Sequence, residues 1–375
     1  MNDLQKRTWA EISLDNIRHN YEAIRATLPE GCRFLGVVKA DAYGHGALAV
    51  AKLLQEAGAE YLAVSCLDEA LELRQGGVTM PILILGHTPP EYTATLIDRG
   101  FTQTVSALAK AREYSEAATA LGKKLCIHIK LDTGMSRLGF LCAGGYFEKG
   151  VSNVLESIAL PGLETEGVYT HFAVSDVPGE ESEAYTMAQF KLFMEVIAAV
   201  EERSGFLFPI RHCANSGAVL HYPKMDLDMV RPGLLLYGYG DEEGKLGLRP
   251  CMRLVTTVST IKHYEAGTSV SYGRRFVCQR HTRMGVLGIG YADGLPRILS
   301  NRVSFAAGEG FAPPRGSICM DMCMVDLSDR PEVHVGDEVE IFGEKNDLNA
   351  LAEAAGTIPY ELLCSVYKRV PRVYR

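Results

Sequence analysis

Residues 34–46 read FLGVVKADAYGHG. The first five form an apolar run, which is typical of a buried strand. The run ends at Lys39, and an ammonium group is rarely buried without a partner, because removing it from water costs free energy. A tyrosine between small residues and a Gly-His-Gly turn follow. The stretch therefore predicts a buried strand that ends in a lysine with a functional role.

The same kind of apolar run recurs along the chain, and an amphipathic helix fills most of the gaps. The runs occupy residues 34–38, 61–64, 82–85, 102–105, 125–131, 167–172, 210–214 and 233–237. Near-continuous apolar strands that alternate with helices are typical of a parallel sheet covered on both faces. Eight such units predict a closed (β/α)8 barrel of the TIM type. An open doubly wound sheet is the alternative, but GIGYADG at residues 288–294 has the wrong spacing for a dinucleotide fingerprint.

The pattern changes near residue 240, where short strand-like runs follow one another with glycine-containing turns between them. One further helix is predicted at residues 347–356, followed by a short tail. The sequence therefore predicts an α/β protein with two domains. Residues 1–240 form the barrel, and residues 241–375 form a mostly β-strand domain to which residues 1–12 add a strand.

Composition and charge limit the partners of the chain. The net charge of −8 argues against a general attraction to nucleic acid or to an anionic membrane. No apolar stretch is long enough to span a bilayer, and the first residues lack a signal-peptide pattern, so we expect a cytoplasmic protein. The ten cysteines are scattered and form neither a disulfide framework nor a metal motif. We therefore expect reduced thiols, no metal and a small-molecule partner.

Polar residues lie at the ends of several predicted strands. They are Lys39, Arg137, His171, Asn215, Ser216 and Arg231, and Gly233 flanks the eighth predicted strand together with Arg231. Each alone has an ordinary structural explanation, since Asn-Ser-Gly is a common turn and a histidine at a strand end is commonly structural. In a barrel, however, these ends meet at one mouth, where active sites lie. Cationic and hydrogen-bonding groups gathered there indicate an anion with a planar ring.

The chemistry of these residues points to one cofactor. Ser216 and the backbone amides near Gly233 and Leu234 could bind a phosphate, because glycine permits close approach and amides donate to phosphate oxygens. A lysine at the same mouth could form a Schiff base with an aldehyde. Together these features predict pyridoxal 5′-phosphate (PLP).

Nine motifs along essentially the whole chain resemble those of the alanine racemase family. In order they are VVKADAYGHG, KLDTGMSRLGF, THFA, CANSG, RPGLLLYG, VSYG, GYADG, GSICMDMCMVD and RVPRVY. The resemblance implies a PLP-dependent enzyme that interconverts L-alanine and D-alanine and supplies D-alanine for peptidoglycan. It also implies a barrel joined to a β domain, and a head-to-tail homodimer whose active sites take residues from both chains.

The resemblance assigns two bases, because racemisation removes a proton from one face of Cα and returns it on the other. Lys39 would hold the cofactor and act on one face. Tyr272, from the partner subunit, would act on the opposite face. Arg231 would face the pyridine nitrogen, with His171 between it and the tyrosine. Arg137 would bind the phenolic oxygen of the ring and the substrate carboxylate.

Further contacts follow from the same resemblance. The remaining cofactor contacts are Tyr43, Leu85, Asn215, Ser216, Gly233 and Leu234. Met320 of the partner's CMD motif would contact the substrate, with Cys319 and Asp321 beside it, and Tyr291 would narrow the entrance to the substrate site. Lys130 matches a lysine that is carbamylated in some members, and an ordinary strand lysine is the alternative. Tyr367 is a weaker cofactor contact, because Lys368 stands where the family often has a tyrosine before RVPR.

Three other functions compete with alanine racemisation. PLP-dependent amino acid decarboxylases share the architecture but present a carboxylate to the ring nitrogen, where this chain has Arg231. A non-enzymatic PLP-binding protein has a barrel without a second domain. A serine racemase of the vancomycin-resistance type would share almost every motif, and the sequence leaves alanine and serine open because one hydroxyl separates them.

Overall fold

The computed structural model of the chain describes residues 7–241 and 243–375. These residues fall into two compact units. The barrel unit contains Arg18–Ala42 and Ala47–Leu248. The β unit contains the described residues up to Ile17, together with Tyr43–Gly46 and Arg249–Arg375. The domain bounds of 1–240 and 241–375 stay a prediction, and residues 1–6 of the predicted first strand lie outside the described residues.

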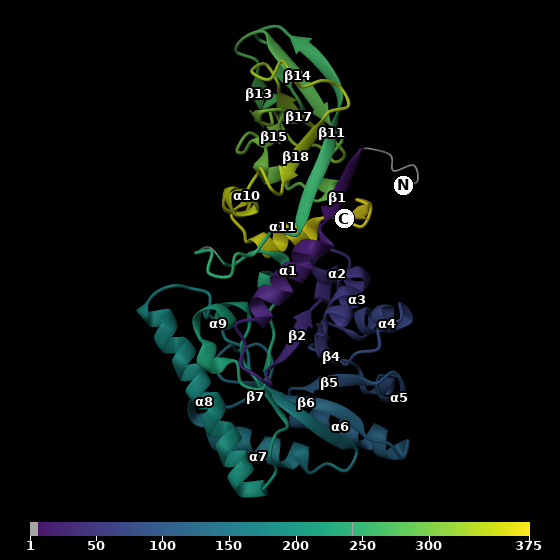
Figure 1. Ribbon diagram of the computed structural model, residues 1–375, viewed down its shortest axis with the longest axis vertical. Helices are drawn as coiled ribbons and strands as arrows, with labels where there is room; N and C mark the ends of the chain where they lie inside the picture. Colours follow the sequence, from purple (N-terminus) through teal and green to yellow (C-terminus); the bar gives the residue numbers. More distant parts are fainter. Residues whose placement is uncertain (1–6, 242) are drawn as a thin grey trace. The chain divides into compact units, whose positions relative to one another are not determined.

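Parallel strands form the main sheet of the barrel unit (Figure 1). They are β2 (Arg33–Val37), β3 (Tyr61–Val64), β4 (Ile82–Ile84), β5 (Phe101–Val105), β6 (Leu125–Asp132), β8 (Leu163–Tyr169), β9 (Ile210–His212) and β10 (Met229–Val230). The short β7 (Phe140–Leu141) pairs with the end of β6. The pairing order is β10-β2-β3-β4-β5-β6-β8-β9. Beside β10, the backbone N of Arg231 donates to the carbonyl of Ala214 at 2.9 Å, just after β9. The sheet is therefore nearly closed, which confirms the predicted (β/α)8 barrel.

Helices surround these strands, and Figure 1 shows several of them on the outside of the barrel. The α-helices of this region are α1 (Leu14–Arg25), α2 (Lys39–Tyr43), α3 (Ala47–Ala57), α4 (Leu67–Gln75), α5 (Thr93–Asp98), α6 (Leu108–Ala120), α7 (Phe147–Ile158), α8 (Glu180–Ser204) and α9 (Ser216–His221). Their apolar residues recur at helical spacing; in α3, for example, Val50, Leu53 and Leu54 are buried. The short 3-10 helices are η1 (Pro90–Tyr92), η2 (Gly144–Tyr146), η3 (Pro223–Met225) and η4 (Leu234–Tyr237).

Two predicted strands differ from the structure. The prediction of a strand at residues 233–237 is wrong: residues 234–237 form the 3-10 helix η4, Gly233 precedes it as its N-cap, and the eighth strand is β10. Periodicity cannot separate the two conformations, because LLLY is buried in either case. The proline in Arg-Pro-Gly lacks the N–H that a continuing strand needs. Strand β8 also begins earlier than the predicted residue 167, because the polar LETE segment does not read as a buried strand.

The β unit is built on a second sheet. Its strands are β1 (Thr8–Ile12), β11 (Met252–Tyr264), β14 (Thr282–Leu287), β15 (Phe305–Ala307), β16 (Gly310–Ala312), β17 (Cys323–Asp326), β18 (Glu338–Phe342) and β19 (Arg372–Tyr374). Strand β1 pairs antiparallel with β11 and parallel with β19. A separate ribbon pairs β12 (Ser269–Val270) with β13 (Phe276–Val277). The short 3-10 helices are η5 (Tyr272–Arg274), η6 (Tyr291–Asp293) and η7 (Arg297–Leu299). The mostly β-strand C-terminal domain is thus confirmed.

The end of the chain is more regular than the sequence suggests. The predicted helix at residues 347–356 is α10 (Leu348–Ala355), with Asp347 as its N-cap. The segment expected to be a short tail contains a second helix, α11 (Pro359–Ser365), and β19. Pro359 at the first position of α11 is compatible with a helix start, because the first N–H groups have no partner in the helix.

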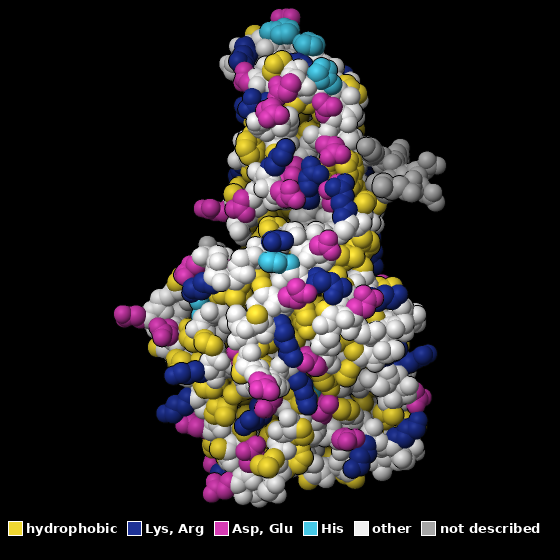
Figure 2. Space-filling model, viewed as in Figure 1, with side chains coloured by type: hydrophobic (Ala, Val, Ile, Leu, Met, Phe, Trp, Pro, Cys, Tyr) yellow, Lys and Arg dark blue, Asp and Glu magenta, His cyan; other side chains and the backbone are white. Residues whose placement is uncertain are grey.

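Charged side chains of both signs are interspersed on the face shown in Figure 2. Lysine and arginine side chains alternate there with aspartate and glutamate, so this face offers no extended field of one sign to a polyanion. Within residues 7–241 and 243–375, no helix combines the length and the apolar character needed to cross a membrane.

Candidate active site

The backbone directly after Lys39 forms a left-handed helical turn. Ala40, Asp41 and Ala42 have φ values of 52°, 54° and 53°. Tyr43, the next residue, has φ of 53°. The left-handed conformation costs an L-residue about 1–2 kcal/mol. Four such residues in succession therefore need compensation from their surroundings, and strain of this kind is concentrated at functional sites.

Two carboxylates hold the left-handed turn in place. Glu69 accepts hydrogen bonds from the backbone N of Ala40 and of Ser65, both at 2.7 Å. Asp41 accepts a hydrogen bond from the backbone N of Ala47, the first residue of α3, also at 2.7 Å. This contact satisfies one of the free N–H groups at the start of the helix. The predicted lysine therefore stands at the end of β2 on a strained but firmly held backbone.

Arg231 follows β10 directly and is only 5% exposed. Its Nη1 donates to Nδ1 of His212 at 3.0 Å. Its Nη2 donates to the backbone carbonyl oxygens of Thr170 at 2.7 Å and Cys213 at 3.2 Å. Nη2 also lies 3.5 Å from Nδ1 of His171. Groups at the ends of β8 and β9 therefore fix the orientation of the guanidinium.

Positive charge surrounds the imidazole of His171. Its pKa lies well below the ordinary value of a histidine, first because of burial and then because four cations act on it. These cations are Arg231, Lys130, Arg137 and Lys39. His171 is therefore neutral near pH 7. A set of cations around a neutral imidazole fits an anionic ligand such as the phosphate and phenolate of PLP or an amino acid carboxylate.

Lys130 is 5% exposed on β6. Its Nζ lies 5.5 Å from the centre of the Tyr169 ring. Burial, followed by the charges of Arg137 and Arg231, lowers the pKa of Lys130 to about 8, although Asp132 acts in the opposite direction. A substantial fraction of this amine is therefore neutral at slightly alkaline pH.

Asp132 shapes the loop that carries Arg137. Its Oδ1 accepts hydrogen bonds from the backbone N of Gly134 and of Ser136, both at 3.0 Å. Ser136 has φ of 56°, so the loop turns sharply immediately before the arginine. Arg137 itself is exposed. The Asp-Thr-Gly part of the KLDTGMSRLGF motif thus has a structural purpose, which is to place the arginine beside the barrel strands.

The predicted phosphate contacts lie together at the start of α9. Oγ of Ser216 accepts a hydrogen bond from the backbone N of Gly233 at 2.9 Å. Asn215 caps the helix, and its Oδ1 accepts from the backbone N of Ala218 at 3.0 Å. The backbone N–H of Gly233, which is predicted to bind phosphate, thus donates to the hydroxyl oxygen of Ser216. The hydroxyl hydrogen of that serine is the donor that suits a phosphate oxygen.

Leu85 and Tyr43, two further predicted cofactor contacts, lie on other segments of the chain than Ser216 and Gly233. Leu85 directly follows β4, and its backbone N donates to the carbonyl of Val64 at 2.9 Å. Tyr43 is 6% exposed, and its ring lies 5.7 Å from the ring of Tyr360. Burial raises the pKa of Tyr43, so its phenol is a hydrogen-bond donor and not an anion. Tyr360 is an aromatic neighbour that the sequence motifs do not indicate.

A second set of predicted residues lies on adjacent loops of the β unit. The backbone N of Tyr291 donates to the carbonyl of Cys319 at 3.0 Å. Oγ of Ser271 lies 3.4 Å from Sγ of the same cysteine. Tyr272 is 73% exposed and Met320 is 53% exposed. The loops that carry VSYG, GYADG and CMD therefore meet, and they leave a phenol and a thioether uncovered on their own chain.

The buried carboxylate of Asp293 ties these loops to the C-terminal motif. Arg369 donates to Asp293 at 2.7 Å and to Asp321 at 2.8 Å. Arg7 donates to both carboxylate oxygens of Asp293 at 3.0 and 2.8 Å. The backbone N of Tyr367 donates to the carbonyl of Asp293 at 3.2 Å. Burial alone would raise the pKa of Asp293, but the two arginines outweigh it and lower that pKa.

Sequence reasoning misses the residues that orient Arg231. His212 and Thr170 fall inside predicted strands, and nothing in the motifs indicates their contact with the arginine. A signal does exist, since polar residues inside apolar strand runs need hydrogen-bond partners. The structure thus divides the predicted residues into two sets. The barrel unit holds the cationic set around His171, and the β unit holds the set around Tyr272.

Both halves of the chain match known families. Residues 12–241 match the family described as alanine racemase, N-terminal domain. Residues 251–374 match the family described as alanine racemase, C-terminal domain. An alanine racemase of Clostridium perfringens SM101 is 44% identical over 375 residues, which cover 98% of this chain and 95% of that protein.

Solved structures agree with these matches. Alanine racemase from Clostridium difficile 630 has a TM-score of 0.92 at 39% identity, covering 100% of this chain and 97% of that chain. Alanine racemase from Bacillus anthracis with bound L-Ala-P has a TM-score of 0.91 at 33% identity, covering 99% of this chain and 96% of that chain. By the family matches, the identity and the coverage, the chain belongs to the alanine racemase family.

Proposed function

We propose that this chain interconverts L-alanine and D-alanine with PLP as cofactor. The observation that carries the proposal is the cationic set at the barrel strand ends, where Lys39, Lys130, Arg137 and Arg231 all act on the neutral His171. Membership of the alanine racemase family and the name of the 44% identical relative support the same activity. D-alanine produced in the cytoplasm would serve peptidoglycan synthesis.

The residues present fit the cofactor. Lys39 would hold PLP, the hydroxyl of Ser216 would donate to the phosphate, and Arg231 would face the ring nitrogen. When bound, the ring withdraws electrons from the substrate and so makes its Cα–H more acidic. The guanidinium of Arg231 disfavours a proton on the ring nitrogen, because it only donates hydrogen bonds and carries a positive charge. A weaker electron sink suits racemisation, since it limits side reactions such as transamination.

Two bases on opposite faces of Cα carry the proton transfers. The amine of Lys39 removes or returns the proton on one face. The phenol of Tyr272, from a second copy of the chain, does so on the other. Its exposure of 73% supports this role, because a phenol uncovered on its own chain is available to another copy. His171 is neutral and can exchange a proton with the phenol.

The homodimer has independent support from the surface of the β unit. The large apolar side chains exposed there include Tyr272, Tyr291, Ile298, Phe311, Met320 and Met322. Such residues are more common at interfaces than on the open surface of a monomer. A second copy covering them would bring the tyrosine base to the barrel mouth of its partner.

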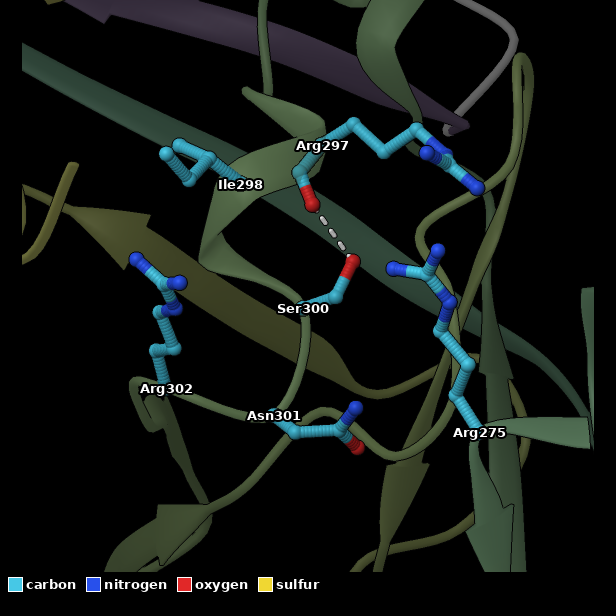
Figure 3. Close-up of a pocket in the computed structure, with 6 residues that line it drawn as sticks. All are labelled: Arg275, Arg297, Ile298, Ser300, Asn301 and Arg302. Carbon is cyan, nitrogen blue, oxygen red and sulfur yellow. Dashed lines mark hydrogen bonds between the residues drawn. The ribbon is translucent and has the colours of Figure 1, made fainter. Parts of the chain in front are cut away.

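A pocket of about 330 Å³ in the β unit adds a charged part to this surface (Figure 3). Arg275, Arg297 and Arg302 line it together with Ser300 and Asn301. Figure 3 shows the side chains of Arg275 and Arg297 extending toward one another. None of the three arginines forms an ion pair with another described residue. Acidic side chains of a second copy would complement them, as at other interfaces.

Two experiments test the proposal. Lys39→Ala should abolish racemisation and the absorbance of protein-bound PLP, and retained racemase activity in this variant would refute the assignment. Comparing kcat/KM for L-alanine, D-alanine, L-serine and D-serine identifies the substrate. We expect a clear preference for alanine. A preference for serine would overturn the substrate while leaving the two-base mechanism in place.

A further inference from the structure

A row of hydrogen bonds continues from Arg231 through the interior of the barrel unit. Nη1 of Arg231 lies 3.0 Å from Nδ1 of His212. Nε2 of His212 lies 2.9 Å from Nδ1 of His128. Nε2 of His128 lies 3.3 Å from Oε2 of Glu166. Both imidazoles are fully buried. We call these four residues the buried relay, although the side chain of Glu166 at its end is 31% exposed.

The direction of every proton in the buried relay follows from the arginine. A guanidinium has donors and no acceptor, so Nδ1 of His212 must accept and its proton must be on Nε2. That Nε2–H donates to Nδ1 of His128, whose own proton must then also be on Nε2. The proton on Nε2 of His128 needs an acceptor, and Glu166 provides it. Both histidines are therefore neutral Nε2–H tautomers.

The charges of the relay agree with this assignment. Burial is the main reason why the pKa values of His128 and His212 are lowered, so both rings are neutral at pH 7. Burial would raise the pKa of Glu166, but the hydrogen bonds from His128 and Tyr61 outweigh it and lower the pKa to about 2. The relay thus runs from a permanent cation to a permanent anion through two neutral rings.

The backbone is built to place Glu166 at the end of this row. Strand β8 pairs with β6 so that Ile127 is opposite Thr165 and His128 is opposite Gly167. Glu166 is the extra residue of a bulge, and a bulge redirects a side chain that regular pairing would place elsewhere. A Cβ on Gly167 would lie 2.7–2.8 Å from three atoms of the His128 ring, so glycine lets the ring lie against the strand.

Two more donors converge on the same carboxylate oxygen. The hydroxyl of Tyr61 donates to Oε2 of Glu166, and Sγ of Cys126 lies 3.3 Å from it. Burial raises the pKa of Tyr61, and burial followed by the charge of Glu166 raises that of Cys126 to about 12. Both groups therefore stay protonated, and as hydrogen-bond donors they help to hold the carboxylate in place. His128, Tyr61 and Cys126 are all donors, and all three need the acceptor that Oε2 of Glu166 provides.

We propose that Glu166 is a positioning residue for the reaction, which acts on the cofactor ring through His128, His212 and Arg231. By accepting from His128, the carboxylate keeps both histidines in the tautomer that presents a bare Nδ1 to the guanidinium. Without this acceptor, either ring could turn its proton toward its neighbour. An N–H of His212 would then oppose an N–H of Arg231, and the guanidinium would have to move. The inference rests on the proposed function, in which Arg231 faces the ring nitrogen.

The first test measures the tautomers in the full chain before and after PLP is added. Nitrogen-15 NMR of the histidine side chains distinguishes an Nε2–H imidazole from its Nδ1–H form. In the unmodified chain we expect His128 and His212 to be Nε2–H imidazoles that stay neutral below pH 7. In Glu166→Leu we expect mixed tautomers. Glu166→Gln retains an acceptor oxygen and should keep the Nε2–H form. Because this readout needs no activity, its failure is separate from a failure of the proposed function.

The second test measures kinetics on the same variants. For Glu166→Leu we expect kcat to fall by about tenfold or more with little change in KM, because wrongly oriented supporting groups impair the reaction step. Glu166→Gln should restore most of kcat. Glu164→Gln is the matched control, because Glu164 lies on the same strand and is exposed. It should behave like the unmodified chain in both tests.

Each outcome decides the proposal. Mixed tautomers and a reduced kcat in Glu166→Leu, with both restored in Glu166→Gln, would support it. Unchanged tautomers, or changed tautomers with an unchanged kcat, would overturn it. If Glu166→Leu does not fold, Gly167→Ala replaces it, because the added methyl group displaces the His128 ring from the carboxylate. Gly167→Ala should then show the same mixed tautomers and reduced kcat, and normal values for both would overturn the proposal.

Discussion

Nη2 of Arg231 donates to the backbone carbonyl of Thr170 at 2.7 Å, immediately before His171 in the chain. One residue thus fixes the backbone that carries the imidazole and also contacts its Nδ1 at 3.5 Å. Because the arginine is 5% exposed and held on both sides, its charge is placed with little freedom. Arg231, which is assigned to the ring nitrogen, and His171, which is assigned to the tyrosine base, are therefore positioned together.

Arg231→Lys should lower kcat by about 100-fold or more, because a lysine ammonium cannot reproduce the planar fork that reaches several partners. One nitrogen cannot contact both His212 and the carbonyl of Thr170 in the observed arrangement. Steady-state racemisation, followed by circular dichroism of alanine, measures the loss. Arg211→Lys is a useful control, because Arg211 pairs with Asp228 at 2.8 Å and has no assigned role in the reaction. Equal losses in the two variants would contradict the role of Arg231.

Lys130 should carry a carbamate when bicarbonate is present. Its pKa of about 8 leaves a neutral amine that can react with CO2, and an anion there would offset the charges of Arg137 and Arg231. Carbon-13 NMR after equilibration with labelled bicarbonate should show a carbamate signal that weakens as the pH falls below about 8. Lys130→Ala should lose the signal, and the surface variant Lys110→Ala should retain it. A chain without this signal at pH 8 has an ordinary strand lysine at residue 130.

The left-handed turn predicts an unusual response to glycine. Ala40 is exposed and has φ of 52°, so Ala40→Gly removes strain of about 1–2 kcal/mol and offsets the entropy cost of glycine. Ala198 is exposed within the right-handed helix α8, and Ala198→Gly should cost about 1 kcal/mol. Denaturant unfolding should therefore rank the first variant as more stable than the second. The reverse order would show that the turn is not strained in solution.

Asp226 should make stability depend on pH. It is 2% exposed, its Oδ1 has no hydrogen-bond partner among the described residues, and burial raises its pKa to about 7. An unfolded aspartate titrates near 4, so between pH 4 and 7 the folded state binds the proton more tightly. Its contribution to stability is therefore largest at low pH and is lost as the pH rises through 7. The melting temperature of Asp226→Asn should exceed that of the unmodified chain increasingly from pH 4 to pH 8. A constant difference would contradict the raised pKa.

The barrel could be predicted because its strands are short apolar runs with helices between them. The exceptions have physical reasons. LLLY at residues 234–237 is buried in η4, and periodicity alone cannot separate a short buried helix from a strand. The start of β8 escapes prediction because Glu164 and Glu166 are polar, although they belong to a strand that contains a bulge.

The candidate site could be named residue by residue from its motifs, but its supporting contacts could not. Ala-Asp-Ala after Lys39 gives no sign of a left-handed turn, because the turn depends on acceptors as distant in the chain as Glu69. The contact of His212 with Arg231 depends on the closure of β9 against β10. The contact of Asp293 with Arg369 likewise forms only in the folded β unit. Long-range pairing determines these contacts, and local sequence does not encode it.

The two-base mechanism is tested most directly by isotope exchange in Tyr272→Phe. Incubated with the variant in D2O, one alanine enantiomer should still exchange its Cα hydrogen through Lys39. The other enantiomer should exchange at a strongly reduced rate, and net interconversion should stop. If Tyr272→Phe still converts L-alanine to D-alanine at the rate of the unmodified chain, the phenol is not a base and the two-base mechanism is wrong.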